Sequence, residues 1–329
     1  MSLDGKILAR AKAALETKRR QNEELLASRT RKVYTEAPRV RESDAELRLT
    51  MTELVGAAFG ADAELRVEDI RVRNQELQRQ RRDELINAGF PDNYLDDEFM
   101  CQKCRDTGYI NAIMCECLTE LYKEEQRKSL SSLFKLGDES FDNFDLSFYD
   151  DMPSPDADTP PRQSMEIVYE SCVEYARKFG SKSRNLLFIG KPGLGKTFLS
   201  ACIARVVADN GFSVVYDMAA SIFAKFEDAQ FQRTDDIERV RNEIKRYLEC
   251  DLLIIDDLGT EMTTAFTISA LYEIINTRLI TGKKTLVNTN LSISELRLRY
   301  SEQIVSRLEG EHKVLVFSGD DIRKKRNML

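Results

Sequence analysis

A glycine-rich octapeptide between an apolar strand and a helix constrains the fold of this chain more than any other feature. It consists of Gly190, Lys191, Pro192, Gly193, Leu194, Gly195, Lys196 and Thr197, is followed by Phe198, and fits the pattern G-x4-G-K-[ST]. Glycines allow successive backbone N–H groups to turn toward phosphates, and the helix N-terminus adds partial positive charge. The sequence therefore predicts an ATP site in which Lys196 reaches the β- and γ-phosphates and Thr197 contacts Mg2+.

Short apolar strands and helices alternate around this motif. The predicted strands are Asn185–Ile189, Ser213–Tyr216, Asp251–Ile255, Lys284–Asn288 and Lys313–Phe317. Helices are expected between them, including Lys196–Asn210, Ile237–Leu248 and Phe266–Thr281. Strands connected through helices form parallel sheets covered on both faces, so we expect an α/β domain with a five-stranded parallel sheet.

One of these strands ends in two carboxylates, Asp256 and Asp257. A hard cation prefers oxygen ligands, so Asp256 is expected to hold Mg2+. Asp257 is the candidate general base for the attacking water. The alternative is a strand end with two solvated acids. A paired acid favours ATP hydrolysis over a small-molecule P-loop kinase, and no arginine-rich lid segment supports a kinase.

Polar residues further along the chain are candidates for contacts with the γ-phosphate. Asn290 follows the strand at Lys284–Asn288 and is the better candidate, with Asn288 second, although asparagine also ends strands as an ordinary turn residue. Arg307, near the end of an amphipathic helix, fits a trans-acting arginine finger. A surface arginine at a helix C-terminus is equally ordinary.

The segment from residue 185 to residue 317 resembles the AAA+ module of bacterial replicative-helicase loaders of the DnaC/DnaI type and of related IstB-type transposition ATPases. The resemblance lies in the runs GKPGLGKT, LLIIDDLG, TLVNTNLS and YSEQIVSRL. It implies nucleotide-dependent self-association or partner assembly, Asn290 as sensor 1 and Arg307 as arginine finger. It also implies Arg323 as a second sensor, although Arg323 begins a basic tail that is equally consistent with a charged terminus.

Four of the seven cysteines lie close together in the sequence: Cys101, Cys104, Cys115 and Cys117. Four thiolates provide one closed tetrahedral Zn2+ site, which is structural because no coordination position stays open. An iron–sulfur cluster also takes four cysteines and is the alternative. The run from Cys101 to Ile110 resembles the zinc region of Gram-positive-type loaders. Cys172, Cys202 and Cys250 lie in apolar stretches and are expected to be small buried hydrophobes.

Composition changes along the chain suggest the domain boundaries. Residues 1–98 are predicted to form a helical partner-binding region, and residues 99–149 a four-cysteine zinc module with a connecting helix. Residues 150–163 hold four of the chain's seven prolines among Asp, Ser and Thr and are predicted to be a linker. Residues 164–329 would then form the ATPase domain.

Hydrophobic residues make up 42% of the chain and charged residues 32%, which is typical of a soluble globular protein. No apolar run approaches the roughly 20 residues of a membrane span. The N-terminus lacks the apolar block of a secretory signal, so we expect a cytoplasmic protein without membrane contact.

Together these features predict an ATP-dependent loader of the hexameric replicative DNA helicase. In this interpretation the N-terminal region binds the helicase, the AAA+ domain binds ATP and single-stranded DNA, and hydrolysis is weak and partner-stimulated. The alternatives are an IstB-type transposition-partner ATPase and a nucleotide-regulated adaptor with little turnover. The cysteines favour the loader and the paired aspartates disfavour the adaptor.

Overall fold

The computed structural model describes residues 3–57, 63–131, 139–153, 159–231 and 236–323. The chain divides into two compact units. Unit 1 comprises Met1–Ala11 and Thr119–Leu329, and unit 2 comprises Lys12–Leu118. Two helices, α1 (Gly5–Glu36) and α4 (Glu116–Ser131), each contain residues of both units.

Unit 1 is built on a five-stranded parallel sheet with the order β4-β5-β6-β3-β7. Its strands are β3 (Asn185–Ile189), β4 (Val214–Met218), β5 (Leu252–Leu258), β6 (Lys284–Thr289) and β7 (His312–Val316). The predicted α/β class and the five parallel strands are confirmed. Strand β6 lies between β3, which precedes the glycine-rich loop, and β5, which carries the paired aspartates.

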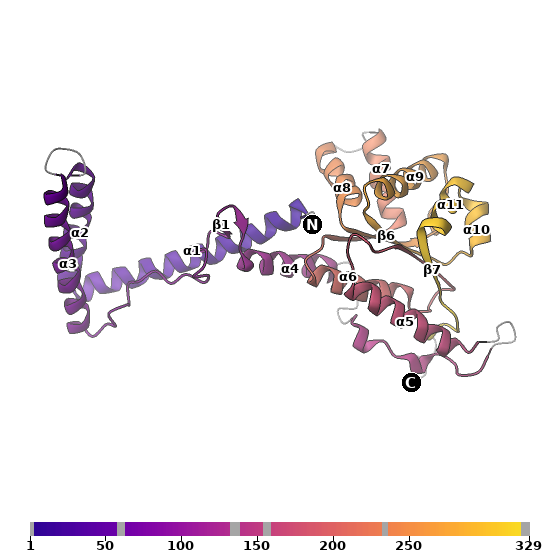
Figure 1. Ribbon diagram of the computed structural model, residues 1–329, viewed down its shortest axis with the longest axis horizontal. Helices are drawn as coiled ribbons and strands as arrows, with labels where there is room; N and C mark the ends of the chain where they lie inside the picture. Colours follow the sequence, from indigo (N-terminus) through magenta and orange to yellow (C-terminus); the bar gives the residue numbers. More distant parts are fainter. Residues whose placement is uncertain (1–2, 58–62, 132–138, 154–158, 232–235, 324–329) are drawn as a thin grey trace. The chain divides into compact units, whose positions relative to one another are not determined.

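Helices cover both faces of this sheet (Figure 1). On one face are α5 (Pro161–Arg177) and α6 (Lys196–Asp209). On the other are α7 (Ala219–Phe231), α8 (Ile237–Glu249), α9 (Ala265–Ile280), α10 (Ile293–Arg299) and α11 (Glu302–Glu311). Successive strand residues alternate between the two apolar cores: Ile254 packs on the α5/α6 side and Ile255 on the other.

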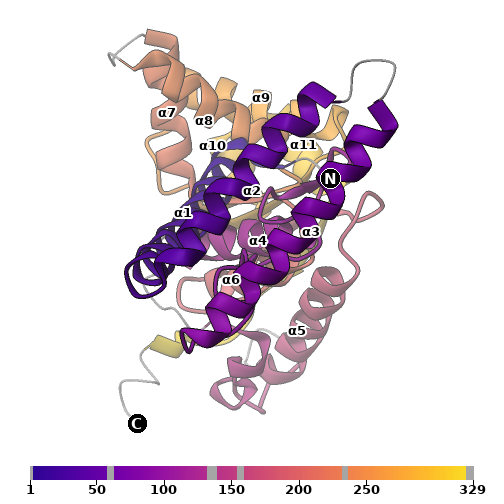
Figure 2. The ribbon, with the colours of Figure 1, turned by 90° about the vertical axis from the view of Figure 1, so that its left-hand side faces the viewer.

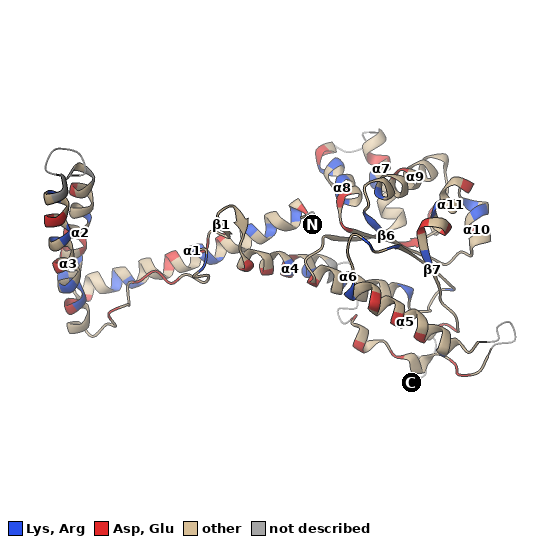
Figure 3. Ribbon diagram, in the orientation of Figure 1, with Lys and Arg blue, Asp and Glu red and all other residues tan. Residues whose placement is uncertain are grey.

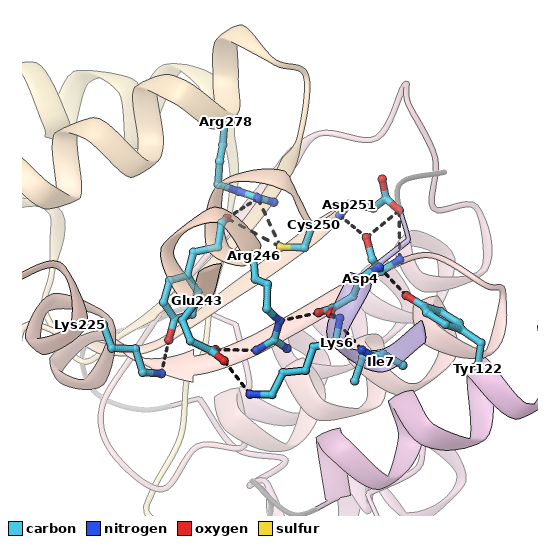
Figure 4. A network of polar contacts seen from close by, with 12 residues as sticks. Asp4, Lys6, Ile7, Tyr122, Lys225, Glu243, Arg246, Cys250, Asp251 and Arg278 are labelled. Carbon is cyan, nitrogen blue, oxygen red and sulfur yellow. Dashed lines mark hydrogen bonds and ion pairs between the residues drawn. The ribbon is translucent and has the colours of Figure 1, made fainter. Parts of the chain in front are cut away.

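The first turn of α1 belongs to unit 1, where a buried aspartate links it to α8 and α4 (Figure 4). The Asp4 carboxylate accepts the backbone N–H groups of Lys6 (2.9 Å) and Ile7 (3.2 Å), which begins the helix. Its second oxygen accepts a hydrogen bond from Arg246 Nε of α8 at 2.6 Å. The backbone N–H of Asp4 donates to the Tyr122 hydroxyl of α4 at 2.9 Å.

Unit 2 is mainly helical, as predicted. Helices α2 (Pro38–Ala57) and α3 (Ala63–Asn87) lie alongside each other (Figure 2). A small apolar core containing Val33, Val40 and Leu85 joins them to α1. Basic and acidic residues are interspersed along all three helices (Figure 3). A two-stranded hairpin, β1 (Tyr109–Ile110) and β2 (Ile113–Met114), follows the first two clustered cysteines.

The segment before the ATPase sheet carries two short 3-10 turns, η1 (Phe141–Asn143) and η2 (Leu146–Phe148). Helix α5 begins at Pro161, within the stretch predicted as a linker. The domain boundaries drawn from composition remain predictions. No helix among the described residues is long and apolar enough to cross a membrane.

Candidate functional site

The glycine-rich loop connects β3 to α6 as the motif predicts. Gly193 and Gly195 have φ values of 80° and 85°, a backbone region that residues with a Cβ rarely adopt. A Cβ on Gly193 would overlap the Asp321 carboxylate, and one on Gly195 would lie 3.0 Å from the Tyr149 hydroxyl. These glycines therefore permit both the loop conformation and the close approach of two other segments.

Lys196 lies at the start of α6 with 5% of its surface exposed. Its Nζ donates to the carbonyl oxygens of Gly190 (2.6 Å) and Lys191 (2.8 Å) and to Asn290 Oδ1 (2.8 Å). Burial lowers the pKa of Lys196 to about 8, and the nearby carboxylates of Asp257 and Asp256 oppose that shift. The ammonium group is thus already placed between the loop backbone and the polar end of β6.

The paired acids lie next to the loop at the carboxyl end of the sheet. Thr197 Oγ1 is 3.1 Å from Asp256 Oδ2, so the two oxygen groups assigned to Mg2+ are neighbours. Carboxylate and hydroxyl oxygens are the donors that Mg2+ prefers, and Thr197 is exposed while Asp256 is buried. The donor set and its position beside the loop fit a magnesium ion.

Asp257 differs from Asp256 in conformation and exposure. Its φ is 52°, and it is half-buried. Burial and the charge of Asp256 raise the pKa of Asp257, whereas Lys196, Arg323 and a hydrogen bond from Asn290 lower it. A raised pKa makes a carboxylate a better proton acceptor, which suits the general base predicted here.

Asn288 lies in β6 and Asn290 directly follows it, and the two side chains have different surroundings. Asn290 is half-buried and contacts Lys196, whereas Asn288 is fully buried and donates to Asp256 Oδ1 at 2.8 Å. The structure thus places Asn290, the preferred sensor candidate, beside Lys196, and Asn288 beside Asp256.

The two candidate arginines have different surroundings. Arg307 stacks on Tyr272 of α9, 4.8 Å from the ring centre, and donates to its hydroxyl at 3.1 Å. Among the described residues no hydrogen bond joins Arg307 to the loop. Arg323 is exposed, and its charge lowers the pKa of both Lys196 and Asp257. The remainder of the basic tail, residues 324–326, lies outside the described residues.

Sequence reasoning missed several neighbours of the loop. The Tyr149 hydroxyl donates to the carbonyl of Leu194 at 3.0 Å, and the Ile322 backbone N–H donates to the carbonyl of Gly193 at 3.0 Å. The ring of Phe198 lies 5.8 Å from that of Phe144. Four aromatic residues lie between residues 141 and 149 in the sequence, but nothing in their local pattern indicates that they pack on the loop.

The four clustered cysteines come together in unit 2. The Sγ atoms of Cys101, Cys104, Cys115 and Cys117 all lie within 4.8 Å of one another. Cys101 and Cys115 are 3.7 Å apart, and Cys104 and Cys117 are 3.4 Å apart. Four sulfurs about 2.3 Å from a tetrahedral ion are roughly 3.8 Å from each other, so the arrangement fits Zn2+.

Hydrogen bonds within the cysteine segment set the backbone geometry around the four sulfurs. The Asp106 carboxylate accepts the N–H groups of Met100 (3.1 Å) and Cys101 (2.8 Å), and the Gly108 N–H donates to Cys104 Sγ at 3.4 Å. A Cβ on Gly108, whose φ is 77°, would lie 3.0 Å from Leu15. The cysteines are thus held by a tight turn, and Gly108 in this turn lies close to Leu15 of α1.

Comparison with known proteins supports the ATP-binding assignment. Residues 171–329 match the family described as IstB-like ATP binding protein. The replicative helicase loader DnaC of Buchnera aphidicola is 28% identical over 155 residues, which is 46% of this chain and 61% of that protein. DnaC of Escherichia coli K12 is 25% identical over 153 residues, with the same coverage of each chain.

Two further similarities are more limited. An insertion sequence IS5376 putative ATP-binding protein of Geobacillus stearothermophilus is 26% identical over 140 residues, covering 41% of this chain and 48% of that protein. A crystal structure of the DnaC helicase loader covers 55% of this chain and 97% of its own, with a TM-score of 0.44 and 20% identity. The matched segment spans less than two thirds of the curated relatives' length.

Proposed function

We propose, from the IstB-like ATP-binding domain at residues 171–329, that this chain is an ATP-dependent loader of a replicative DNA helicase. The observation that carries the proposal is the similarity of this domain to proteins named replicative helicase loader DnaC. The domain contains the glycine-rich loop and both acids, so the similarity covers the residues that would bind ATP.

The ATPase mechanism depends on positioning and charge. Backbone N–H groups from Gly190 to Thr197 and the Lys196 ammonium would hold the triphosphate. Thr197 and Asp256 would hold Mg2+, which when bound neutralises charge on the phosphates. Asp257 would accept a proton from the attacking water.

Three further residues complete the proposed site. Asn290 would contact the γ-phosphate, and Arg323 would sense the nucleotide from the C-terminal segment. Arg307 would act on the nucleotide of a neighbouring subunit, since it lies on α11 and makes no hydrogen bond to its own loop among the described residues. This trans role requires self-association through AAA+ interfaces, and weak hydrolysis by the isolated chain follows from it.

Unit 2 would serve the partner. The cluster of Cys101, Cys104, Cys115 and Cys117 would bind a structural Zn2+, and the helices preceding it would bind the hexameric helicase. The ATPase domain would contact single-stranded DNA. All of these interactions would take place in the cytoplasm.

Affinity capture with the purified hexameric helicase tests the proposal. The wild-type chain is expected to retain helicase, and ATP is expected to change the amount retained. The Lys196→Ala variant should lose ATP binding and the ATP effect but keep its zinc, because Lys196 lies in a different unit from the cysteines. Capture without any helicase, at any nucleotide concentration, would contradict a loader role.

A transposition-partner ATPase is the second candidate, because the matching family and the Geobacillus relative both belong to IstB-like or insertion-sequence proteins. The cysteine cluster favours the loader, since the transposition role requires no zinc module at this place. Retention of a transposase in place of the helicase in the same capture experiment would support the second candidate.

A further inference from the structure

The Asp256 carboxylate is surrounded by hydrogen-bond donors from separate parts of unit 1. Its Oδ1 accepts Asn288 Nδ2 at 2.8 Å and the Asp257 backbone N–H at 3.0 Å. Its Oδ2 accepts Thr197 Oγ1 at 3.1 Å and the hydroxyl of Tyr216. Thr197 and Asp257 belong to the predicted motifs, whereas Tyr216 comes from β4 and Asn288 from β6.

The sheet register explains how Tyr216 reaches this carboxylate. Tyr216 pairs with Ile254 on β5, and both side chains lie in the core beneath α6. Asp256 is two residues beyond Ile254, so its side chain projects from the same face, roughly 6.6 Å further along the strand. A tyrosine side chain leaning along the strand can cover that span, which a shorter residue cannot.

Asn288 approaches the carboxylate from the opposite neighbouring strand. It pairs with Phe188 of β3, and Phe188 lies in the core beneath α6. Ser200 Oγ of α6 donates to Asn288 Oδ1 at 2.9 Å. The Asp256 carboxylate sets the orientation of this amide, because the flipped orientation would bring the Asn288 oxygen against it. Asn288 and Ser200 are both fully buried.

We propose that Tyr216 and Asn288 are positioning residues for Asp256, which they hold from either side so that it meets a magnesium ion at Thr197. This assignment rests on the proposed ATPase function and extends it beyond the sequence motifs. Both residues are uncharged, so they orient the carboxylate without cancelling the negative charge that attracts a cation. In this assignment both residues act through Asp256.

Asn288 and Asn290 then have separate roles. Asn290 contacts Lys196 and serves the phosphate, whereas Asn288 serves the metal acid. The hydrogen bond from Ser200 to Asn288 extends this arrangement to α6, the helix that also carries Lys196 and Thr197. Direct side-chain contacts thereby join Asp256 to Thr197 of the loop and to the neighbouring strands β4 and β6.

The test is a Mg2+ titration of ATP binding by Tyr216→Phe, which removes only the hydroxyl. We expect the Mg2+ concentration for half-maximal binding to rise about tenfold, the smaller end of effects seen when a metal ligand loses its outer partner. Affinity for ATP in EDTA should stay within about twofold of wild type, because the loop and Lys196 are unchanged. Asn288→Ser should shift the Mg2+ dependence in the same direction.

Tyr175→Phe is the matched control. The Tyr175 hydroxyl is also buried but has no hydrogen-bond partner among the described residues, so its loss should leave the Mg2+ dependence as in wild type. An unchanged Mg2+ requirement in Tyr216→Phe and Asn288→Ser, or an equal loss of affinity with and without Mg2+, would overturn the assignment. Failure of the wild-type chain to bind ATP at any Mg2+ concentration would instead refute the ATPase function itself.

Discussion

The polar contacts within unit 1 differ in kind from those within unit 2. In unit 1, buried polar side chains bond across elements that are far apart in the chain, such as Tyr216 to Asp256. In unit 2, many polar contacts are exposed pairs within one helix, such as Arg19 with Glu23, or belong to the cysteine turn. Exposed pairs contribute little, about 0–1 kcal/mol each. Unit 1 is therefore linked by buried polar contacts, whereas the cysteine turn of unit 2 would be linked mainly by the proposed Zn2+.

Removing the proposed Zn2+ tests this difference and should have the largest effect. Structural zinc contributes roughly 10–16 kcal/mol of apparent binding free energy in small peptides, so Cys104→Ser or a chelator should abolish amide protection across residues 99–118. Amide protection in unit 1 and ATP affinity should not change. Hydrogen exchange of the full chain, with zinc content measured in parallel, provides the measurement.

Cys202→Ala serves as the control for this experiment. Cys202 is buried in the core of unit 1, and its replacement should leave the zinc content unchanged. Protection of residues 99–118 that persists in zinc-free protein would show that hydrogen bonds and packing alone hold the turn.

The local motifs of the site could be predicted from the sequence, whereas the long-range contacts to them could not. The glycine-rich loop, the Asp256–Asp257 pair and the cysteine spacing are local patterns, so their positions could be inferred directly. Tyr216 and Asp321 act through contacts that exist only once the sheet register and the C-terminal segment are fixed. Nothing in the residues around them signals those contacts. The sheet itself was predictable because each strand is a short apolar run between helices.

A buried arginine in unit 1 provides the next test. Arg278 is fully buried and donates to the Tyr247 carbonyl at 2.6 Å and to Thr285 Oγ1 at 3.0 Å. Arg278→Met should lower the free energy of unfolding of unit 1 by about 3–5 kcal/mol, because several buried acceptors lose their donor. Denaturant titration measures the loss of unfolding free energy, and hydrogen exchange read along the chain shows which unit has lost stability.

The comparison variant lies in unit 2. Arg81 pairs with Asp44 at 2.6 Å, with the two side chains 23% and 16% exposed. Arg81→Met should cost less, about 1–2 kcal/mol, because the Asp44 carboxylate keeps the hydrogen bond from Tyr34. Equal losses in the two variants would contradict the contrast between the units.

Acid should destabilise unit 1 through the chain's single histidine. Burial lowers the pKa of His312 from 6.5 to about 4. Between these values the unfolded chain binds more protons than the folded one, so stability falls as pH drops from 6.5 and levels off below 4. The loss should reach about 3 kcal/mol. His312→Gln should flatten this part of the stability profile measured by denaturant titration, and an unchanged slope would exclude the imidazole as its cause.

The last prediction concerns Asp4, where α1 begins in unit 1. Asp4→Ala removes both the helix cap and the contact with Arg246, and should cost about 1–3 kcal/mol. Asp4→Ser keeps a capping oxygen for the N–H groups of Lys6 and Ile7 but loses the ion pair, so it should recover part of the loss. Arg246 keeps its contact with Glu243 in both variants, which limits the penalty. Because α1 continues into unit 2, hydrogen exchange along the helix shows whether the loss stays near Asp4 or spreads past Lys12. Spreading would mean that unit 2 also draws stability from this buried contact, and the contrast between the units would then be weaker than their local contacts suggest.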